Sequence, residues 1–155
     1  ITLIYQFISG AEEIKSDLDQ KTQEELERLL VNQGQKVALP LHTATLYRGE
    51  NHVFGLGILN TLDITENFYI TVRLEKVADS AENDITAQVD TAEAAGWVFY
   101  DSGALPLESN GNRKEALLVQ VPKEAIKGRY IFVATVSRSD KTTYGNPQTF
   151  IVTVV

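Results

Sequence analysis

Residues 117–136 read LLVQVPKEAIKGRYIFVATV, and they contain the most specific fold signal in the chain. They hold two apolar runs, 117–121 and 130–136, on either side of a polar corner. Pro122 ends the first run, and Gly128 stands two residues before Tyr130, where the second run begins. Short runs rich in β-branched and aromatic residues, bounded by Pro and Gly, are typical of strands. The stretch therefore predicts two strands joined by a tight corner.

Similar runs fill the chain after Gly34. The clearest is 67–77, in which Phe68, Ile70, Val72 and Leu74 alternate with polar residues, as in a half-buried strand. Further candidates are 35–47, 50–60, 84–90, 96–103 and 148–155. Turn residues separate the runs at 48–51, 109–112, 127–128 and 144–147. Seven or eight strands at this spacing predict an antiparallel β-sandwich.

Residues 117–136 also resemble the strand E, corner and strand F region of immunoglobulin-like domains, and QTFIVTVV at 148–155 resembles strand G. The resemblance implies a tyrosine corner, in which the phenol of Tyr130 bonds to the backbone across the turn. It also suggests Trp97 as a large aromatic between the sheets. The core residues we expect are Phe54, Ile70, Val72, Trp97, Tyr130 and Phe132.

The first 34 residues have a helical pattern instead. Steps of three and four residues place Ile4, Phe7, Ala11, Ile14 and Leu18 on one helix face. After a polar stretch the stripe resumes at Leu26, Leu29 and Leu30, which we expect to anchor the helix to the sandwich. Gly34 is a helix stop. The predicted layout is α+β but mainly β, with a long helix at 1–34 followed by an immunoglobulin-like β-sandwich at 35–155.

The start of the chain is apolar nearly all round the predicted helix. Ile1, Leu3, Ile4, Tyr5, Phe7 and Ile8 cannot share one narrow stripe. A helix of this kind is buried by lipid or by several partners, and its side chains left in water would promote association. The chain contains no methionine, which indicates that residues lay upstream of Ile1, removed by processing or by the choice of boundary. We therefore predict an assembly or membrane segment formed by Ile1, Leu3, Ile4, Tyr5, Phe7, Ile8, Ala11, Ile14 and Leu18.

Composition and motifs argue against several kinds of chemistry. A net charge of −7 argues against nucleic acid as a partner. The absence of cysteine removes disulfides and zinc–thiolate sites. His42 and His52 could approach each other across a hairpin, but a third metal ligand is not evident. Gly55 and Gly57 lie inside a strand pattern and indicate close backbone approach or a bulge rather than a dinucleotide loop.

The acidic clusters at 79–84 and 63–67 are interpreted as solvated turns, because neither has the spacing of a calcium-binding loop. No nucleophile elbow or catalytic triad pattern is present in the sequence. We therefore predict neither an enzyme nor a cofactor.

The layout resembles archaeal type IV pilins and archaellins. The residues that carry the resemblance are ITLIYQFISGAEEI at 1–14, RGENHVFGLGILNTL at 48–62 and the closing GRYIFVATV and PQTFIVTV. It implies an extracellular filament of copies of this chain, held together by the apolar helix, with the β-sandwich facing outward. It also implies that the apolar helix lies in the membrane before assembly. Mature subunits of the family usually begin with a longer apolar run than this chain has.

Two alternatives stay open. In the first, ITLIYQF at 1–7 acts as a strand donated to the open sheet of a neighbouring subunit. In the second, the sandwich is a membrane-tethered adhesin or carbohydrate-binding module at the cell surface. Such a module requires exposed aromatic side chains, for which Tyr69 and Tyr100 are the candidates.

Overall fold

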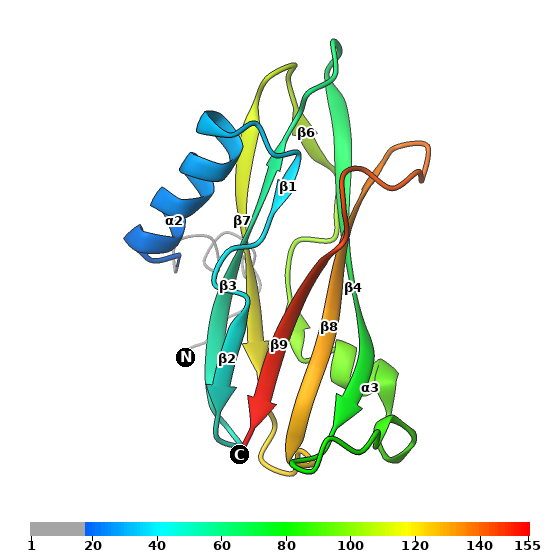
Figure 1. The fold of residues 1–155 in the computed structure, drawn as a ribbon. Helices are drawn as coiled ribbons and strands as arrows, with labels where there is room; N and C mark the ends of the chain where they lie inside the picture. The colour runs from blue at the N-terminus through cyan, green and yellow to red at the C-terminus, as the bar shows by residue number, and fades with distance from the viewer. Residues whose placement is uncertain (1–17) are drawn as a thin grey trace.

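The computed structural model describes residues 18–155, which form two β-sheets packed face to face with a helix outside them (Figure 1). Sheet A has the strand order β1-β3-β7-β5, with β1 Val37–Ala38, β3 Asn51–Leu59, β7 Asn112–Gln120 and β5 Val98–Phe99. Sheet B has the order β2-β9-β8-β4-β6, with β2 Thr43–Leu46, β9 Gln148–Val154, β8 Gly128–Arg138, β4 Glu66–Ala78 and β6 Leu105–Leu107. The predicted β-sandwich is therefore confirmed, with nine strands in the described chain rather than seven or eight.

The strand order is that of an immunoglobulin-like sandwich. Strands β1, β3, β7 and β5 take the places of A, B, E and D, while β4, β8 and β9 take those of C, F and G. The additional strands arise because two segments each serve both sheets. Strand β1 pairs with β3, whereas β2, which follows it, crosses to sheet B and runs parallel to β9. Likewise β5 pairs with β7, and β6 then crosses back to pair with β4.

The core lies between the sheets. Phe54, Phe132 and Phe150 are buried there. The ring centroid of Phe150 lies 4.9 Å from that of Phe54 and 5.2 Å from that of Phe132. Trp97 is buried in the same cluster, as the sequence suggested, and its ring lies 4.7 Å from that of Tyr130. Ile70 is buried too, while Val72 is half-buried and packs on the cluster from its edge.

The predicted tyrosine corner is present. The Tyr130 hydroxyl donates a hydrogen bond of 2.5 Å to the carbonyl oxygen of Ile126, four residues upstream across the turn. Burial of the phenol raises its pKa above the ordinary value. The neutral, hydrogen-bond-donating form is therefore held firmly. This bond fastens the start of β8 to the corner that precedes it.

The helix is shorter at its start than the sequence predicted. It comprises α2 (Gln20–Glu27) and a closing π-helical turn, η1 (Arg28–Asn32). Asp19 caps it: its backbone is extended, with ψ 165°, and its carboxylate accepts a hydrogen bond of 2.7 Å from Thr22 N. An extended residue interrupts a helix, so the prediction of one continuous helix over 1–34 is wrong at Asp19. Residues 1–17 lie outside the described part of the chain.

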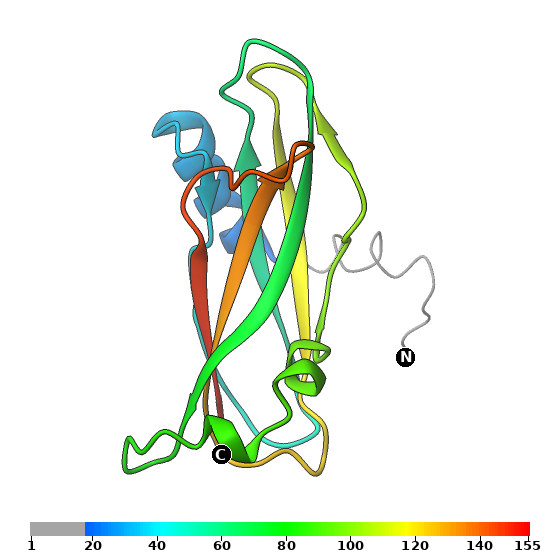
Figure 2. The same ribbon diagram turned by 90° about the vertical axis from the view of Figure 1, so that its right-hand side faces the viewer.

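The helix ends where predicted. Gly34 adopts φ +67°, and its N–H donates to Leu30 O, which is the bond of an αL-type stop. The following Gln35 N donates to Leu29 O. Seen from the side of sheet B, the helix lies behind the sandwich (Figure 2). The short helices η2 (Thr86–Gln88) and α3 (Thr91–Ala95) lie at the opposite end of the sandwich, near the C-terminus.

Candidate functional site

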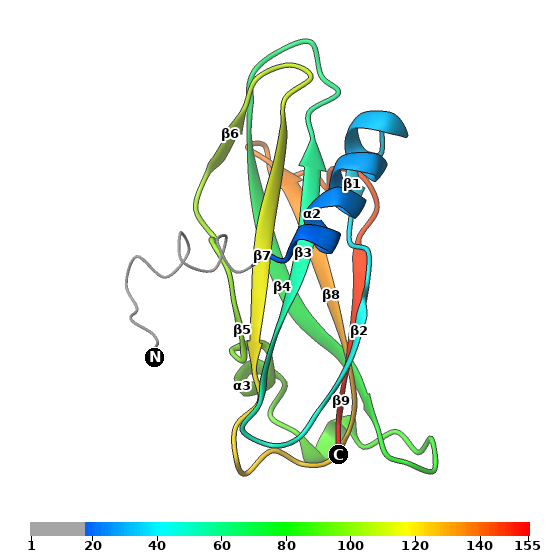
Figure 3. The same ribbon diagram turned by 90° about the vertical axis from the view of Figure 1, so that its left-hand side faces the viewer.

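The outer face of sheet A receives the helix, and it is built from small residues. Inward-facing Phe54 and Leu56 of β3 belong to the core, so Gly55 and Gly57 face outward by the two-residue repeat of a strand. Ala116 of β7 pairs with Gly55 and faces the same way. Figure 3 shows α2 lying across β3 on this face. The glycines thus remove the side chains that would hold the helix away.

The helix presents a row of residues spaced by four: Leu18 just before it, then Thr22, Leu26 and Leu30. A Cβ atom added at Gly57 would lie 2.6 Å from Leu30 Cδ1 and 2.9 Å from Leu26 Cδ2. At Gly55 it would collide with Thr22 and meet Leu26 Cδ1 at 3.2 Å. The helix is therefore seated against the backbone of β3, which confirms that this glycine pair serves close approach.

Two of the three predicted anchor residues, Leu26 and Leu30, are fully buried, and Leu29 is partly buried beside them. Leu18 needs a correction. The sequence analysis placed it in the assembly segment, but it is 6% exposed and packs on Ala116 in sheet A. It falls in the anchor because it stands four residues before Thr22 on the same line of contact. The other predicted assembly residues, Ile1, Leu3, Ile4, Tyr5, Phe7, Ile8, Ala11 and Ile14, lie outside the described residues.

Sequence reasoning missed Thr22, a residue of the helix that is 6% exposed because it faces β3. The stretch 19–25 looked like a polar interruption of the stripe. The four-residue spacing between Leu18 and Leu26 was the signal that would have included it. Burial of Leu18, Leu26 and Leu30 at about 1.5–3 kcal/mol each stabilises the attachment by roughly 5–9 kcal/mol. An ion pair of 2.7 Å between Lys114 and Glu27, both partly exposed, adds little.

Beside the helix, an apolar row crosses sheet A. Register pairs Val53 of β3 with Leu118 of β7, and Leu118 with Phe99 of β5. Val53 and Leu118 pack against Leu18 and Ala116 and are only partly buried, while Phe99 is 43% exposed. The apolar surface that begins at Leu18 therefore extends across the sheet to its β5 edge.

Two titratable groups near the start of the helix, Asp19 and His52, have pKa values shifted from their ordinary values. The two hydrogen bonds that relate Asp19 to Thr22 hold the pKa of the Asp19 carboxyl below its ordinary value. Partial burial lowers the pKa of His52, and the negative charge of Asp19 opposes that shift only in part. The edge of the His52 ring contacts Phe54 at 4.6 Å between centroids. His52 is thus held in its neutral form beside the core.

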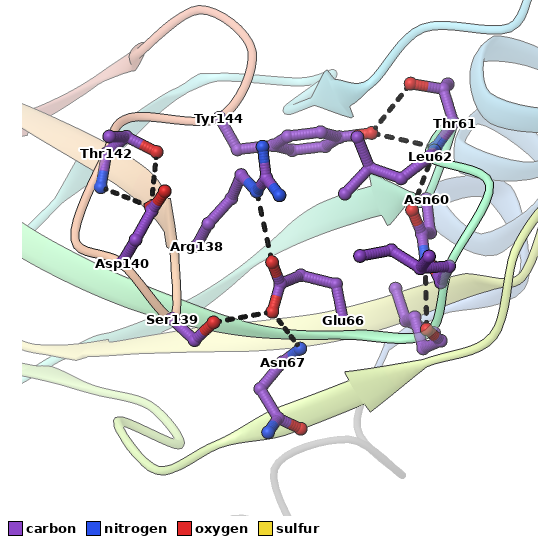
Figure 4. A network of polar contacts seen from close by, with 12 residues as sticks. Asn60, Thr61, Leu62, Glu66, Asn67, Arg138, Ser139, Asp140, Thr142 and Tyr144 are labelled. Carbon is purple, nitrogen blue, oxygen red and sulfur yellow. Dashed lines mark hydrogen bonds and ion pairs between the residues drawn. The ribbon is translucent and has the colours of Figure 1, made fainter.

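A polar network lies at the end of the sandwich opposite α3, and Figure 4 shows it from close by. Glu66 Oε1 accepts hydrogen bonds from Ser139 Oγ and Asn67 N, at 2.7 and 2.9 Å, and its Oε2 accepts one of 3.1 Å from Arg138 Nε. The bond from Ser139 contributes most to a pKa for Glu66 below the ordinary value. A carboxylate held ionised by three donors is a weak base. The network ties β4 to the β8–β9 connection.

A neighbouring group of bonds pins the loop after β3. Buried Asn60 donates from Nδ2 to Ile64 O and Leu107 O, each at 2.9 Å. Tyr144 donates to Leu59 O at 2.6 Å and accepts from Thr61 N at 2.9 Å (Figure 4). These donors and acceptors are matched among themselves, so we assign the whole end of the sandwich a structural role.

The approach of the two histidines across a hairpin, which the sequence left possible, is not supported by the strand pairing. His42 precedes β2 in sheet B, whereas His52 lies on β3 in sheet A. The first strand is divided between the two sheets, so the strands that carry them are not hydrogen-bonded neighbours. Within residues 18–155 no three His, Asp or Glu side chains gather closely enough to hold a metal ion.

The side chains of the acidic turn 79–84 bind to neighbouring groups of the protein, which agrees with the interpretation of this segment as a turn. Asp79 accepts hydrogen bonds from Ala81 N and Asn83 N, and Glu82 forms an ion pair with Arg129. Bonds from Asn83 hold the pKa of Asp79 below its ordinary value. In the part of the chain that the structure describes, no helix is long and apolar enough to cross a membrane.

Of the two aromatic candidates for a binding surface, neither forms an exposed platform. Tyr100 is half-buried against the core, and its hydroxyl accepts a hydrogen bond of 3.1 Å from Val72 N. Tyr69 is also half-buried, on β4. The ring of Phe99, the immediate neighbour of Tyr100, is exposed instead, because alternation along the chain turns these two side chains in opposite directions.

No known protein family matches the sequence, and no curated protein sequence matches it. Solved structures are similar in fold only. The PapD-like domain 7 of human CEP192 is 15% identical, with 77% of this chain and 84% of that chain covered and a TM-score of 0.44. Murine CRIg is 11% identical, with 77% and 98% covered and a TM-score of 0.40. A family 123 glycoside hydrolase from Clostridium perfringens is 12% identical over 86% of this chain, with a TM-score of 0.49, and the chain spans only 25% of its length.

Proposed function

We propose that the protein is a structural subunit of an extracellular helical filament of the type IV pilus kind. In this proposal, copies of the chain associate through the apolar residues of the segment 1–14, which lies in the membrane before assembly, and the β-sandwich faces outward. The observation that carries the proposal is the burial of Leu18 on sheet A. Leu18 is therefore fixed to the sandwich just before the helix begins.

A filament subunit needs such a junction, because load passes from the helical core to the outer domain through it. Pulling on residue 18 would have to unseat Leu18, Thr22, Leu26 and Leu30 from the glycine-lined face of β3. A membrane-tethered adhesin has the opposite requirement, since a flexible tether widens the range over which its binding face can reach. The rigid seat thus favours assembly over tethering.

Helical assembly is also favoured over donor-strand exchange. Donor-strand exchange requires a sheet that lacks a strand. Here β9 occupies the place of strand G and pairs with β8 over seven residues, from Gln148 to Val154. Its other edge is paired in parallel with β2. Within residues 18–155 the place of strand G is therefore already filled by the chain's own β9.

The test uses the 155-residue chain and the double substitution Ile4→Asp with Phe7→Asp. We expect the wild-type chain to form filaments or large oligomers, measured by sedimentation velocity and electron microscopy. The double variant is expected to be monomeric with an unchanged melting temperature, because it changes none of the described residues that form the sandwich core. The matched control carries Val31→Asp and Ile64→Asp, which place the same charges on exposed apolar side chains of the described domain. It should assemble like the wild type.

A wild-type chain that stays monomeric at concentrations where its copies should associate would overturn the proposal. The same holds if the Ile4→Asp, Phe7→Asp variant still assembles. Recovery of monomeric wild-type protein bound to vesicles, with no oligomer in their absence, would establish the tethered alternative instead.

A further inference from the structure

A groove lies at the β5 end of the row of Val53, Leu118 and Phe99, and Phe99 is part of its lining. Figure 3 shows α3 at this end of sheet A. Its volume is about 550 Å³, within the range of sites that take small molecules. Strands β3 and β7 contribute the register pair Asn51 and Gln120, and β5 contributes Phe99. The remaining walls come from α3 with the residues after it, which contribute Glu93 and Trp97, and from the connection between β7 and β8, which contributes Lys123 and Glu124.

The groove combines one exposed aromatic face with several free polar groups. Phe99 is 43% exposed in the lining, which also includes buried Trp97. The lining also contains two amides, two carboxylates and one ammonium group, on Asn51, Gln120, Glu93, Glu124 and Lys123. None of these five side chains has a hydrogen-bond or ion-pair partner among residues 18–155. They therefore present both donors and acceptors to the groove.

This lining discriminates between classes of ligand. A wholly apolar ligand would leave the five polar groups unpaired and desolvated, which costs free energy for each group. Phosphates and other anions would face the carboxylates of Glu93 and Glu124 against the single ammonium of Lys123. A neutral ligand rich in hydroxyl groups meets neither penalty. Sugar hydroxyls both donate and accept, and the apolar C–H face of a sugar ring matches an exposed aromatic ring.

We propose that the groove of sheet A binds a neutral saccharide, which stacks on Phe99 and hydrogen-bonds to Gln120, Asn51 and the carboxylates of Glu93 and Glu124. This function is separate from filament assembly, because the groove lies entirely within the described sandwich. In a filament whose sandwiches face outward, it would place a glycan-recognition site on the exposed surface of each subunit.

Trp97 makes the test direct, since it is the only tryptophan of the chain and it lines the groove. Maltose, cellobiose, lactose and di-N-acetylchitobiose are each titrated into the 155-residue chain to about 10 mM, while tryptophan fluorescence and backbone amide NMR shifts are recorded. We expect at least one sugar to saturate with a dissociation constant on the order of 1 mM, which corresponds to about −4 kcal/mol. The amide shifts should centre on Phe99 and Gln120.

The variant Phe99→Ala should weaken that binding at least about tenfold. Its control is Tyr47→Ala, which removes an aromatic ring that is 68% exposed and stands outside the groove lining, and which should bind like the wild type. Equal melting temperatures of the three proteins exclude misfolding as the cause. The proposal is overturned if no sugar gives a saturable response, or if Phe99→Ala binds as tightly as the wild type. Saturation of the groove by trilysine but by none of the sugars would assign it to basic peptides instead.

Discussion

Replacing Gly57 with alanine probes the seat of the helix with a single methyl group. The new Cβ would lie 2.6 Å from Leu30 Cδ1, 3.1 Å from Leu30 Cγ and 2.9 Å from Leu26 Cδ2. Gly57 does not have a positive φ, so alanine fits the backbone and the collision is purely one of side-chain packing. Leu26 and Leu30 are fully buried and have little free space into which to move.

Two opposing terms set the magnitude. Inserting a methyl group into a packed interface costs about 1–3 kcal/mol. Alanine also restricts the unfolded chain relative to glycine, which returns about 0.4–1 kcal/mol. We therefore expect Gly57→Ala to lower the free energy of unfolding by about 1–2 kcal/mol. At about 2–4 °C per kcal/mol for a chain of this size, the melting temperature should fall by roughly 2–8 °C.

The assay is urea unfolding of four proteins: wild type, Gly57→Ala, Leu30→Ala and the double variant. Leu30→Ala alone should cost about 2–5 kcal/mol, because it opens a cavity under the helix. That cavity accommodates the methyl group that Gly57→Ala introduces, so the double variant should lose less stability than the sum of the two single variants, by about 1 kcal/mol or more. Gly103→Ala is the matched control, since only the Asp101 carboxylate lies near its Cβ, and it should stay within about 0.5 kcal/mol of the wild type. Additive costs at Gly57 and Leu30, or a neutral Gly57→Ala, would refute the close packing of helix and sheet.

Three further predictions concern the sandwich. Tyr130→Phe should lower the free energy of unfolding by about 1 kcal/mol, because it removes the hydrogen bond to Ile126 O. The control is Tyr69→Phe, which should leave the free energy of unfolding unchanged because the Tyr69 hydroxyl has no partner in the described chain. The pKa of Glu66 is lowered in the folded protein, so its contribution is complete above the unfolded value of about 4.3 and is lost as the pH falls; chemical denaturation at several pH values should show the wild type and Glu66→Gln converging in acid. The pKa of His52 is also lowered, so the unfolded chain takes up a proton at His52 before the folded protein does as the pH falls below about 6.5. The free energy of unfolding of His52→Gln should therefore depend less steeply on pH between about 7 and 5 than that of the wild type. Equal slopes for the two proteins would show that His52 is not the source of the dependence.

Much of the sandwich was predictable because local chemistry determines it. Alternation along 67–77 placed Phe68, Ile70 and Leu74 on the buried side of β4. The corner at 122–130 followed from its turn residues, and the structure joins it with the Tyr130 bond. Gly34 ended the helix, since a positive φ suits glycine. Each of these features depends on neighbours within a few positions.

The candidate site was predictable only in part. The leucines of the anchor and the close approach at Gly55 and Gly57 were visible in the sequence, but it did not show that the two meet. Leu18 was assigned to the wrong side of the junction, because the extended backbone at Asp19 divides a stripe that is continuous by periodicity. Phe99 was passed over in favour of Tyr100, which the fold turns toward β4.

The strands, the corner, the end of the helix and the residues able to form a core follow from the sequence alone, because side-chain periodicity and turn chemistry act over a few residues. The pairing of the strands, the division of the first strand between the two sheets and the seat of the helix on β3 emerge only in three dimensions. So does the exposure of Phe99 beside the free side chains of Asn51 and Gln120. Those outcomes depend on contacts between residues far apart in the chain, whose free energies come from packing that no local pattern contains.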